Sequence, residues 1–260
     1  MSQVKPNYPA GHDLLAGRTV VITAAAGTGV GFATAKRCVQ EGALVVISDR
    51  HERRLGQAAE QLSQIAAVPV VGVPCDVTIQ DDVDRLFQTA IAEIGHIDVL
   101  VNNAALGIMS SIVDMSDETW FKVVDVTLNG TFRCTRAALR HMIPRSSGAI
   151  VNLASVVGWR GDANAAPYAA AKAGVMALTR CSAIEAAEYG VRINAVSPSI
   201  ARHKFLDKTT SAELLDRLSA GEAFGRAAEP WEVAATIAFL ASDYSSYLTG
   251  EVISVSSQHP

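Results

Sequence analysis

Short apolar runs alternate along the chain with longer stretches of helical periodicity, and this alternation restricts the fold more than any other feature. The runs rich in Val, Ile, Leu and Ala, which predict buried strands, are residues 19–23, 43–48, 68–73, 97–102, 148–153, 191–196 and 252–255. Helical patterns lie between them, at 31–41, 79–94, 117–142, 168–189 and 230–242. Continuous apolar strands separated by helices form a parallel sheet that is covered on both faces. The chain is therefore predicted to be an α/β protein with a doubly wound parallel sheet of seven strands.

The same pattern predicts how the 260 residues are organised. Residues 1–16 are polar and contain prolines, which predicts an N-terminal arm, and residues 17–260 form a single domain without an internal linker or repeat. Residues 199–228 interrupt the alternation of strands and helices. They are polar, are long for a simple connection, and contain a helical pattern at 211–220. We expect this segment to be a substrate lid.

Composition argues against several classes of protein. Apolar residues make up 49% of the chain and charged residues 18%, which is a globular balance. The net charge of −4 provides no broad attraction to nucleic acid or to an anionic membrane. No apolar run is long enough for a membrane span, and the first residues lack a signal-peptide core. The cysteines and histidines are scattered without metal-binding spacing, so we expect no metal. Together with the charge and the apolar runs, this leads us to expect a cytoplasmic protein without a nucleic-acid or membrane partner.

A turn of small residues follows the first predicted strand directly. It runs from Thr23 to Ala33 and reads Thr-Ala-Ala-Ala-Gly-Thr-Gly-Val-Gly-Phe-Ala. A strand, a small-residue turn and a helix start together present backbone N–H groups and a positive dipole end to a pyrophosphate. Gly29 and Gly31 would let the backbone approach the phosphates. A tight turn between a strand and a helix explains the same residues, so the loop alone does not decide.

The second predicted strand ends at Ser48-Asp49-Arg50. A carboxylate here accepts hydrogen bonds from both hydroxyls of the adenosine ribose and repels a 2′-phosphate, so Asp49 favours NAD over NADP. Arg50, with Arg53 and Arg54 on the next helix, could instead engage a 2′-phosphate. A solvated helix face is the simpler explanation for those arginines.

Tyr168 and Lys172 lie four residues apart in a predicted helix, so their side chains share a face. A cation beside a phenol favours the phenolate and lowers the tyrosine pKa toward a range useful for acid/base chemistry. Ser155, near the end of a predicted strand, could hold a substrate oxygen for the proton transfer. The pair alone also fits an ordinary helix, and the surrounding motifs favour the catalytic interpretation.

Together these motifs resemble those of the short-chain dehydrogenase/reductase family over residues 15–257, which implies a Rossmann-like fold. By this resemblance Tyr168 is the general acid/base, Lys172 holds the nicotinamide ribose and lowers the tyrosine pKa, and Ser155 binds the substrate oxygen. The implied reaction is hydride transfer between C4 of a nicotinamide and a carbinol or carbonyl carbon. The cofactor-binding positions that the resemblance implies are Thr23, Ala25, Gly29, Val30, Gly31, Asp49, Arg50, Asp76, Val77, Asn103, Ala104, Ala105, Tyr168, Lys172 and Pro198.

The sequence also departs from the family pattern. The glycine loop is one residue longer, with Ala24 where the first glycine normally stands, and Ala105 ends a run that normally closes in glycine. Thr127 occupies the site of a helix asparagine that organises a relay water, so we include Thr127 among the catalytic residues and expect its hydroxyl to bind that water. Asn129, rotated by about 200° on a helix, cannot substitute for it. His203 stands where a threonine commonly meets the nicotinamide amide, and we do not assign it as a ligand.

The segments 23–29 and 198–205 resemble a branch of the family associated with steroid-ring breakdown, whose members act on a ring hydroxyl of a coenzyme A thioester. A basic set in the predicted lid, Arg202, His203, Lys204 and Lys208, would suit such an anionic carrier, and a solvated surface explains it equally well. A 3-oxoacyl-thioester reductase of fatty-acid type is the close alternative, because residues 155–158 and 168–174 are very similar to those enzymes.

Two further classes are weighed against an oxidoreductase. A nucleotide-binding sensor without turnover gains support from Thr127, but the complete Ser155, Tyr168 and Lys172 set argues against it. A serine hydrolase is disfavoured because Ser155 lacks a Gly-x-Ser-x-Gly elbow. The resemblance also implies a homodimer or homotetramer assembled through the long helices predicted at 117–142 and 168–189.

Overall fold

The computed structural model describes residues 6–204 and 206–257. Its centre is a parallel sheet of seven strands in the order β3-β2-β1-β4-β5-β6-β7. The strands are β1 (Thr19–Ile22), β2 (Leu44–Asp49), β3 (Val71–Pro74), β4 (Val99–Asn102), β5 (Gly148–Leu153), β6 (Val191–Pro198) and β7 (Val252–Val255). The order reverses direction after β3-β2-β1, as a doubly wound sheet requires, so the predicted fold class is confirmed.

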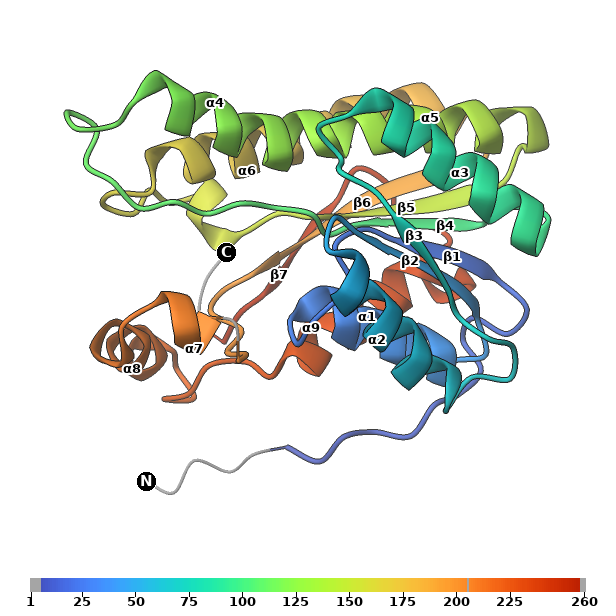
Figure 1. The fold of residues 1–260 in the computed structure, drawn as a ribbon, viewed down its shortest axis with the longest axis horizontal. Helices are drawn as coiled ribbons and strands as arrows, with labels where there is room; N and C mark the ends of the chain where they lie inside the picture. The colour runs from blue at the N-terminus through green and yellow to red at the C-terminus, as the bar shows by residue number, and fades with distance from the viewer. Residues whose placement is uncertain (1–5, 205, 258–260) are drawn as a thin grey trace.

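Helices cover both faces of this sheet (Figure 1). One face carries α1 (Val30–Gln40), α2 (Glu52–Ser63) and α9 (Pro230–Ala241), and the other carries α3 (Gln80–Ile94), α4 (Asp117–Val124), α5 (Gly130–Met142) and α6 (Ala166–Ala187). Val20 and Ile22 of β1 pack in the core beneath the first set, whereas Val21 packs in the core beneath the second. Because alternate side chains meet different apolar layers, the strand is apolar at consecutive positions from Val20 to Ile22.

Two element boundaries differ from the sequence prediction. β3 begins at Val71, because the N–H of Val70 donates to the hydroxyl of Ser63 at 2.9 Å and Pro69 has no N–H to pair. The helix predicted over 117–142 is interrupted by a π-helical segment, Asp125–Asn129, which separates α4 from α5. Such segments are frequent at functional sites.

The N-terminal residues from 6 onward have no helix or strand, but a buried ion pair holds them against α1. The side chains of Arg37 and Glu41 are 6% and 0% exposed and pair with each other. Glu41 accepts hydrogen bonds from the backbone N–H groups of His12 at 2.8 Å and Leu14 at 3.0 Å. Arg37 donates to the carbonyls of residues 9 and 10 at 2.8 and 3.1 Å.

The segment after β6 contains two short helices, α7 (Leu206–Thr209) and α8 (Ala212–Gly221). They lie together beyond one end of the sheet, away from the two helical layers (Figure 1). In the described part of the chain, no helix has both the length and the apolar character that a membrane crossing requires.

Candidate active site

The parallel strands bring the predicted site residues to one edge of the sheet. Thr23 follows β1, Asp49 ends β2, Asn103 follows β4, Ser155 follows β5 and Pro198 ends β6. All these strands run in the same direction, so their carboxyl ends share an edge. In open α/β sheets this is the edge at which ligands bind.

The glycine loop leads into α1 without a side chain capping the helix. Gly29 is the N-cap residue, and no side-chain hydrogen bond caps the first turn, which begins at Val30. A Cβ atom on Gly31 would lie 2.4 Å from Nδ2 of Asn103 and 2.6 Å from the carbonyl oxygen of Ala24. Glycine at 31 therefore lets the loop after β4 approach the helix start. This uncapped, closely packed turn fits a phosphate group.

Thr23 and Asn103 join the glycine loop to the end of β4. The hydroxyl of Thr23 accepts the N–H groups of Asn103 at 3.0 Å and Ala104 at 3.1 Å. Nδ2 of Asn103 donates to the carbonyls of Thr23 at 3.1 Å and Ala24 at 2.9 Å. These side chains therefore shape the loop through contacts within the protein. Ala24 has a φ of 52°, a left-handed conformation that favours the glycine it replaces.

Asp49 lies at the end of β2 against the same loop. Its Oδ1 accepts the N–H of His51 at 3.0 Å, and the backbone of Ala26 also donates to the carboxylate. Burial raises the pKa of Asp49, opposed chiefly by the charge of Arg54. The N–H of Ala25 donates to the carbonyl of Ser48 at 2.9 Å, which fixes the loop to β2. Arg54 and the exposed Arg50 both lower the pKa of this carboxylate, Arg54 more strongly.

Asp76 and Val77 follow β3. Oδ1 of Asp76 accepts the N–H and the hydroxyl of Thr78, at 2.9 and 2.7 Å, so the carboxylate caps its own turn. Val77 is buried beside Gly130, where a Cβ atom would lie 2.6 Å from Cγ2 of the valine. Their predicted contacts with adenine remain a prediction.

Ser155, Tyr168 and Lys172 come together at the start of α6. The side chains of Ser155 and Tyr168 are hydrogen-bonded to each other. Lys172 is 1% exposed, its Nζ donates to the carbonyl of Leu153, and this nitrogen lies 5.5 Å from the centre of the tyrosine ring. The amine of Lys172 therefore lies against the tyrosine ring and the end of β5. The two side chains share one face of α6, as their four-residue spacing predicts.

The electrostatics of this cluster correct one expectation. We expected Lys172 to lower the pKa of Tyr168, but burial raises that pKa to about 12, opposed by the hydrogen bond from Ser155. Burial also lowers the pKa of Lys172 to about 7. Both shifts have the same cause, because removal from water disfavours the charged form of the phenol and of the amine.

Thr127 lies in the π-helical segment and is fully buried. Its hydroxyl accepts the N–H of Leu106 at 3.0 Å and lies 3.4 Å from the carbonyl of the same residue. The hydroxyl thus holds the loop after β4, and its predicted role in a water relay remains a prediction. Nδ2 of Asn129 donates to Asp125 at 3.0 Å, on another side of the helix, as the rotation predicts.

The remaining predicted positions are less closely tied to this cluster. Ala105 is exposed, and Pro198 is buried at the end of β6 in register with Val255. In the lid, Arg202 pairs with Asp207 at 2.8 Å and Asp216 at 3.1 Å. Its guanidinium is therefore engaged within the lid, which weakens its assignment to an anionic carrier.

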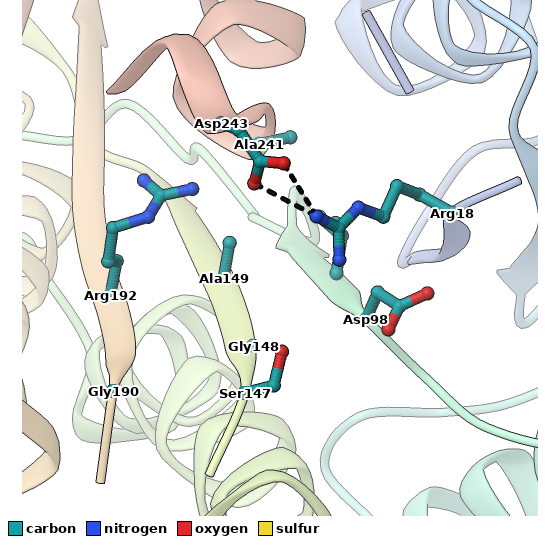
Figure 2. A pocket seen from close by; sticks show the side chains of 10 residues that line it. Arg18, Asp98, Ser147, Gly148, Ala149, Gly190, Arg192, Ala241 and Asp243 are labelled. Carbon is teal, nitrogen blue, oxygen red and sulfur yellow. Dashed lines mark hydrogen bonds and ion pairs between the residues drawn. The ribbon is translucent and has the colours of Figure 1, made fainter. Parts of the chain in front are cut away.

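A cavity of about 90 Å³ lies at the other edge of the sheet, where β4, β5 and β6 begin (Figure 2). One guanidinium nitrogen of Arg18 donates to both carboxylate oxygens of Asp243 there, at 2.8 and 2.9 Å. Arg192 donates to the carbonyls of Leu240 and Ser242, at 2.9 and 3.0 Å, and so fixes β6 to the end of α9. Arg192 is thus a structural residue here. Among the described residues, no group of three His, Cys, Asp or Glu side chains could hold a metal ion.

Proteins that bind dinucleotides share this doubly wound sheet with a glycine-containing turn at its carboxyl edge. The sequence profile described as enoyl-(acyl carrier protein) reductase matches residues 24–257. The chain belongs to the short-chain dehydrogenase/reductase family, whose members use a nicotinamide cofactor, and it is an oxidoreductase of that family.

Individual relatives agree with this assignment. The (5R,7aS)-5-hydroxy-7a-methyl-1-oxo-2,3,5,6,7,7a-hexahydro-1H-indene-carboxyl-CoA reductase of Mycobacterium tuberculosis is 68% identical, over 99% of this chain and 98% of its own. The 3-oxoacyl-[acyl-carrier-protein] reductase FabG of Chlamydia muridarum is 36% identical, over 94% and 98% of the two chains. The crystal structure of a short chain dehydrogenase from Mycobacterium smegmatis is 56% identical and covers 99% of each chain, with a TM-score of 0.89.

Proposed function

We propose that the protein transfers a hydride between NAD and a secondary alcohol or ketone on a ring that carries a coenzyme A thioester, of the kind left by steroid degradation. One observation carries this substrate class: 68% identity, over nearly the whole chain, to a hydroxy-oxo-indene-carboxyl-CoA reductase. The matched region includes the glycine loop, the Tyr-Lys helix and the lid.

Ser155 and Tyr168 are proposed to bind the substrate oxygen. Their mutual hydrogen bond supports this role, because it places the two hydroxyls beside each other. With a pKa of about 12, the phenol of Tyr168 is protonated at neutral pH, so it can donate its proton to a carbonyl oxygen during reduction. The bound nicotinamide supplies the hydride.

Lys172 is proposed to hold the nicotinamide ribose and to stabilise the phenolate. Its Nζ is buried between the carbonyl of Leu153 and the ring of Tyr168, so the side chain is fixed before a ligand arrives. Because the pKa is about 7, protonation of this amine is sensitive to a nearby negative charge, and a forming phenolate favours the ammonium.

The residues at the strand ends fit a nicotinamide dinucleotide. Gly29, Val30 and Gly31 are proposed to receive its pyrophosphate, since no side chain caps this turn. Asp49 is proposed to bind the adenosine ribose and so to select NAD, and its contact with the glycine loop supports that assignment. NADP is the less favoured cofactor, because its 2′-phosphate would meet this carboxylate.

Initial rates with NADH and NADPH test the function directly. We expect turnover of oxo-indene-carboxyl-CoA thioesters with NADH, weak turnover with NADPH, and loss of turnover in Tyr168→Phe with cofactor binding retained. The FabG relative supports a second substrate class, so a 3-oxoacyl thioester belongs in the panel. A faster rate on that straight-chain thioester would replace the proposed substrate, and binding of NADH without turnover of any alcohol or ketone would indicate a sensor.

We further propose a homodimer or homotetramer in the cytoplasm, with residues 199–228 as the lid. Exposed apolar side chains on the helices of one sheet face, Phe121, Phe132 and Ile184, support assembly through α4, α5 and α6. The buried free thiols of Cys38, Cys75 and Cys134 fit a reducing compartment. Light scattering coupled to gel filtration measures the assembly, and a monomer would refute it.

A further inference from the structure

The imidazole of His203, in the proposed lid, lies over the glycine loop. A Cβ atom placed on Gly29 would have Cε1 and Nε2 of the imidazole at 3.5 Å and Cδ2 at 3.7 Å as its nearest neighbours. These three atoms form the outer end of the ring, so Nε2 points toward Gly29, the N-cap residue of α1. The proposed lid and the glycine loop thus meet at the side chain of His203.

The other ring nitrogen fixes the orientation of this imidazole. Nδ1 accepts the N–H of Leu206 at 3.3 Å, at the start of α7. An accepting Nδ1 has no proton, so in the neutral ring the proton is on Nε2, which faces the glycine loop. Burial lowers the pKa of His203, opposed by Asp207, so the neutral ring is the form present at pH 7. The outer nitrogen is therefore a hydrogen-bond donor aimed at the turn.

We propose that His203 donates from Nε2 to the pyrophosphate of the bound dinucleotide, opposite the backbone N–H groups of α1. This inference rests on the proposed function and revises the sequence expectation, which assigned His203 no ligand. It means that the lid carries part of the cofactor site, so cofactor binding and lid position are coupled through one hydrogen bond. Lys204 is exposed beside it.

Two variants separate the ligand role from the role of His203 in holding α7. In His203→Asn the amide oxygen replaces Nδ1 as acceptor for Leu206, but the outer donor is lost. In His203→Gln an N–H group is retained at the reach of Nε2. Lys204→Ala is the matched control, because it removes a neighbouring charge from the same segment. Calorimetry on the purified proteins measures the dissociation constants of NADH, ADP-ribose and adenosine.

A hydrogen bond to a charged group corresponds to an affinity change of about tenfold or more. We therefore expect His203→Asn to weaken NADH and ADP-ribose equally, by about tenfold, and to leave adenosine unchanged. His203→Gln should recover part of this loss, and Lys204→Ala should change each constant less than threefold (~0.6 kcal/mol by RT ln 3). A loss confined to NADH would place His203 at the nicotinamide and overturn the proposal. Unchanged binding in His203→Asn would overturn it too, whereas a wild-type protein that does not bind NADH would refute the proposed function itself.

Discussion

The buried pair of Arg37 and Glu41 gives a stability prediction whose size follows from the structure. Glu41 is fully buried and neutralises a guanidinium that is 6% exposed, and both groups hold the N-terminal residues on α1. Glu41→Gln keeps the shape and one acceptor but leaves the charge of Arg37 without a counter-charge. Removing one partner of a buried pair costs about 3–5 kcal/mol, a large part of the ~5–15 kcal/mol that stabilises a typical domain.

Urea unfolding followed by circular dichroism measures this loss. Asp243→Asn is the control, because its ion pair with Arg18 is 36% and 81% exposed and such pairs contribute less than about 1 kcal/mol. We expect Glu41→Gln to lower the unfolding midpoint with an unchanged slope, and Asp243→Asn to leave it nearly unchanged. Equal, small effects of the two substitutions would refute the reasoning.

The same pair sets a pH dependence. Burial alone would raise the pKa of Glu41, but the N–H groups of His12 and Leu14 and the charge of Arg37 outweigh it, so the pKa is lowered. A lowered carboxyl pKa contributes stability above the unfolded value of about 4.3, and this contribution is lost as the pH falls through the folded value. The stability difference between wild type and Glu41→Gln should be constant near neutral pH and shrink below about pH 4.

Three further substitutions test the loop and its surroundings. Gly31→Ala places a Cβ atom 2.4 Å from Asn103, so the turn must open, and fluorescence titration should show NADH binding weakened by about tenfold or more in a folded protein; unchanged affinity would contradict the close packing. Thr127→Val removes the hydroxyl that binds Leu106 and should cost about 1–3 kcal/mol in urea unfolding, with Thr127→Ser retaining most of the stability; equal losses in both variants would show that the hydroxyl is not responsible. Ala24→Gly relieves the strain of a φ of 52°, so it should raise the free energy of unfolding by about 1 kcal/mol and with it the thermal midpoint. A lower midpoint would argue against strain there.

The strands were predictable because a strand buried on both faces is apolar at most positions, as β1 and β5 are. The π-helical segment was not, because the periodicity over 117–142 is continuous. Gly130 weakens a helix but does not specify a π-helical turn, and the interruption accompanies two tertiary contacts: Thr127 with Leu106, and Gly130 against Val77.

The site shows the same division between local and tertiary information. A spacing of four residues places Tyr168 and Lys172 on one face, but the pKa of each depends on burial by segments distant in the sequence, and that burial reversed the expected shift. The position of His203 over Gly29 depends on the path of the lid, which no local pattern encodes.

Deuterium transfer tests the central claim most directly. A hydroxy-indene-carboxyl-CoA thioester that carries deuterium on its carbinol carbon is incubated with NAD and the wild-type protein, and the NADH formed is analysed by mass spectrometry. We predict one deuterium at C4 of the nicotinamide, and no labelled product with Tyr168→Phe. Release of the deuterium to water, or equal transfer by the phenylalanine variant, would contradict the account.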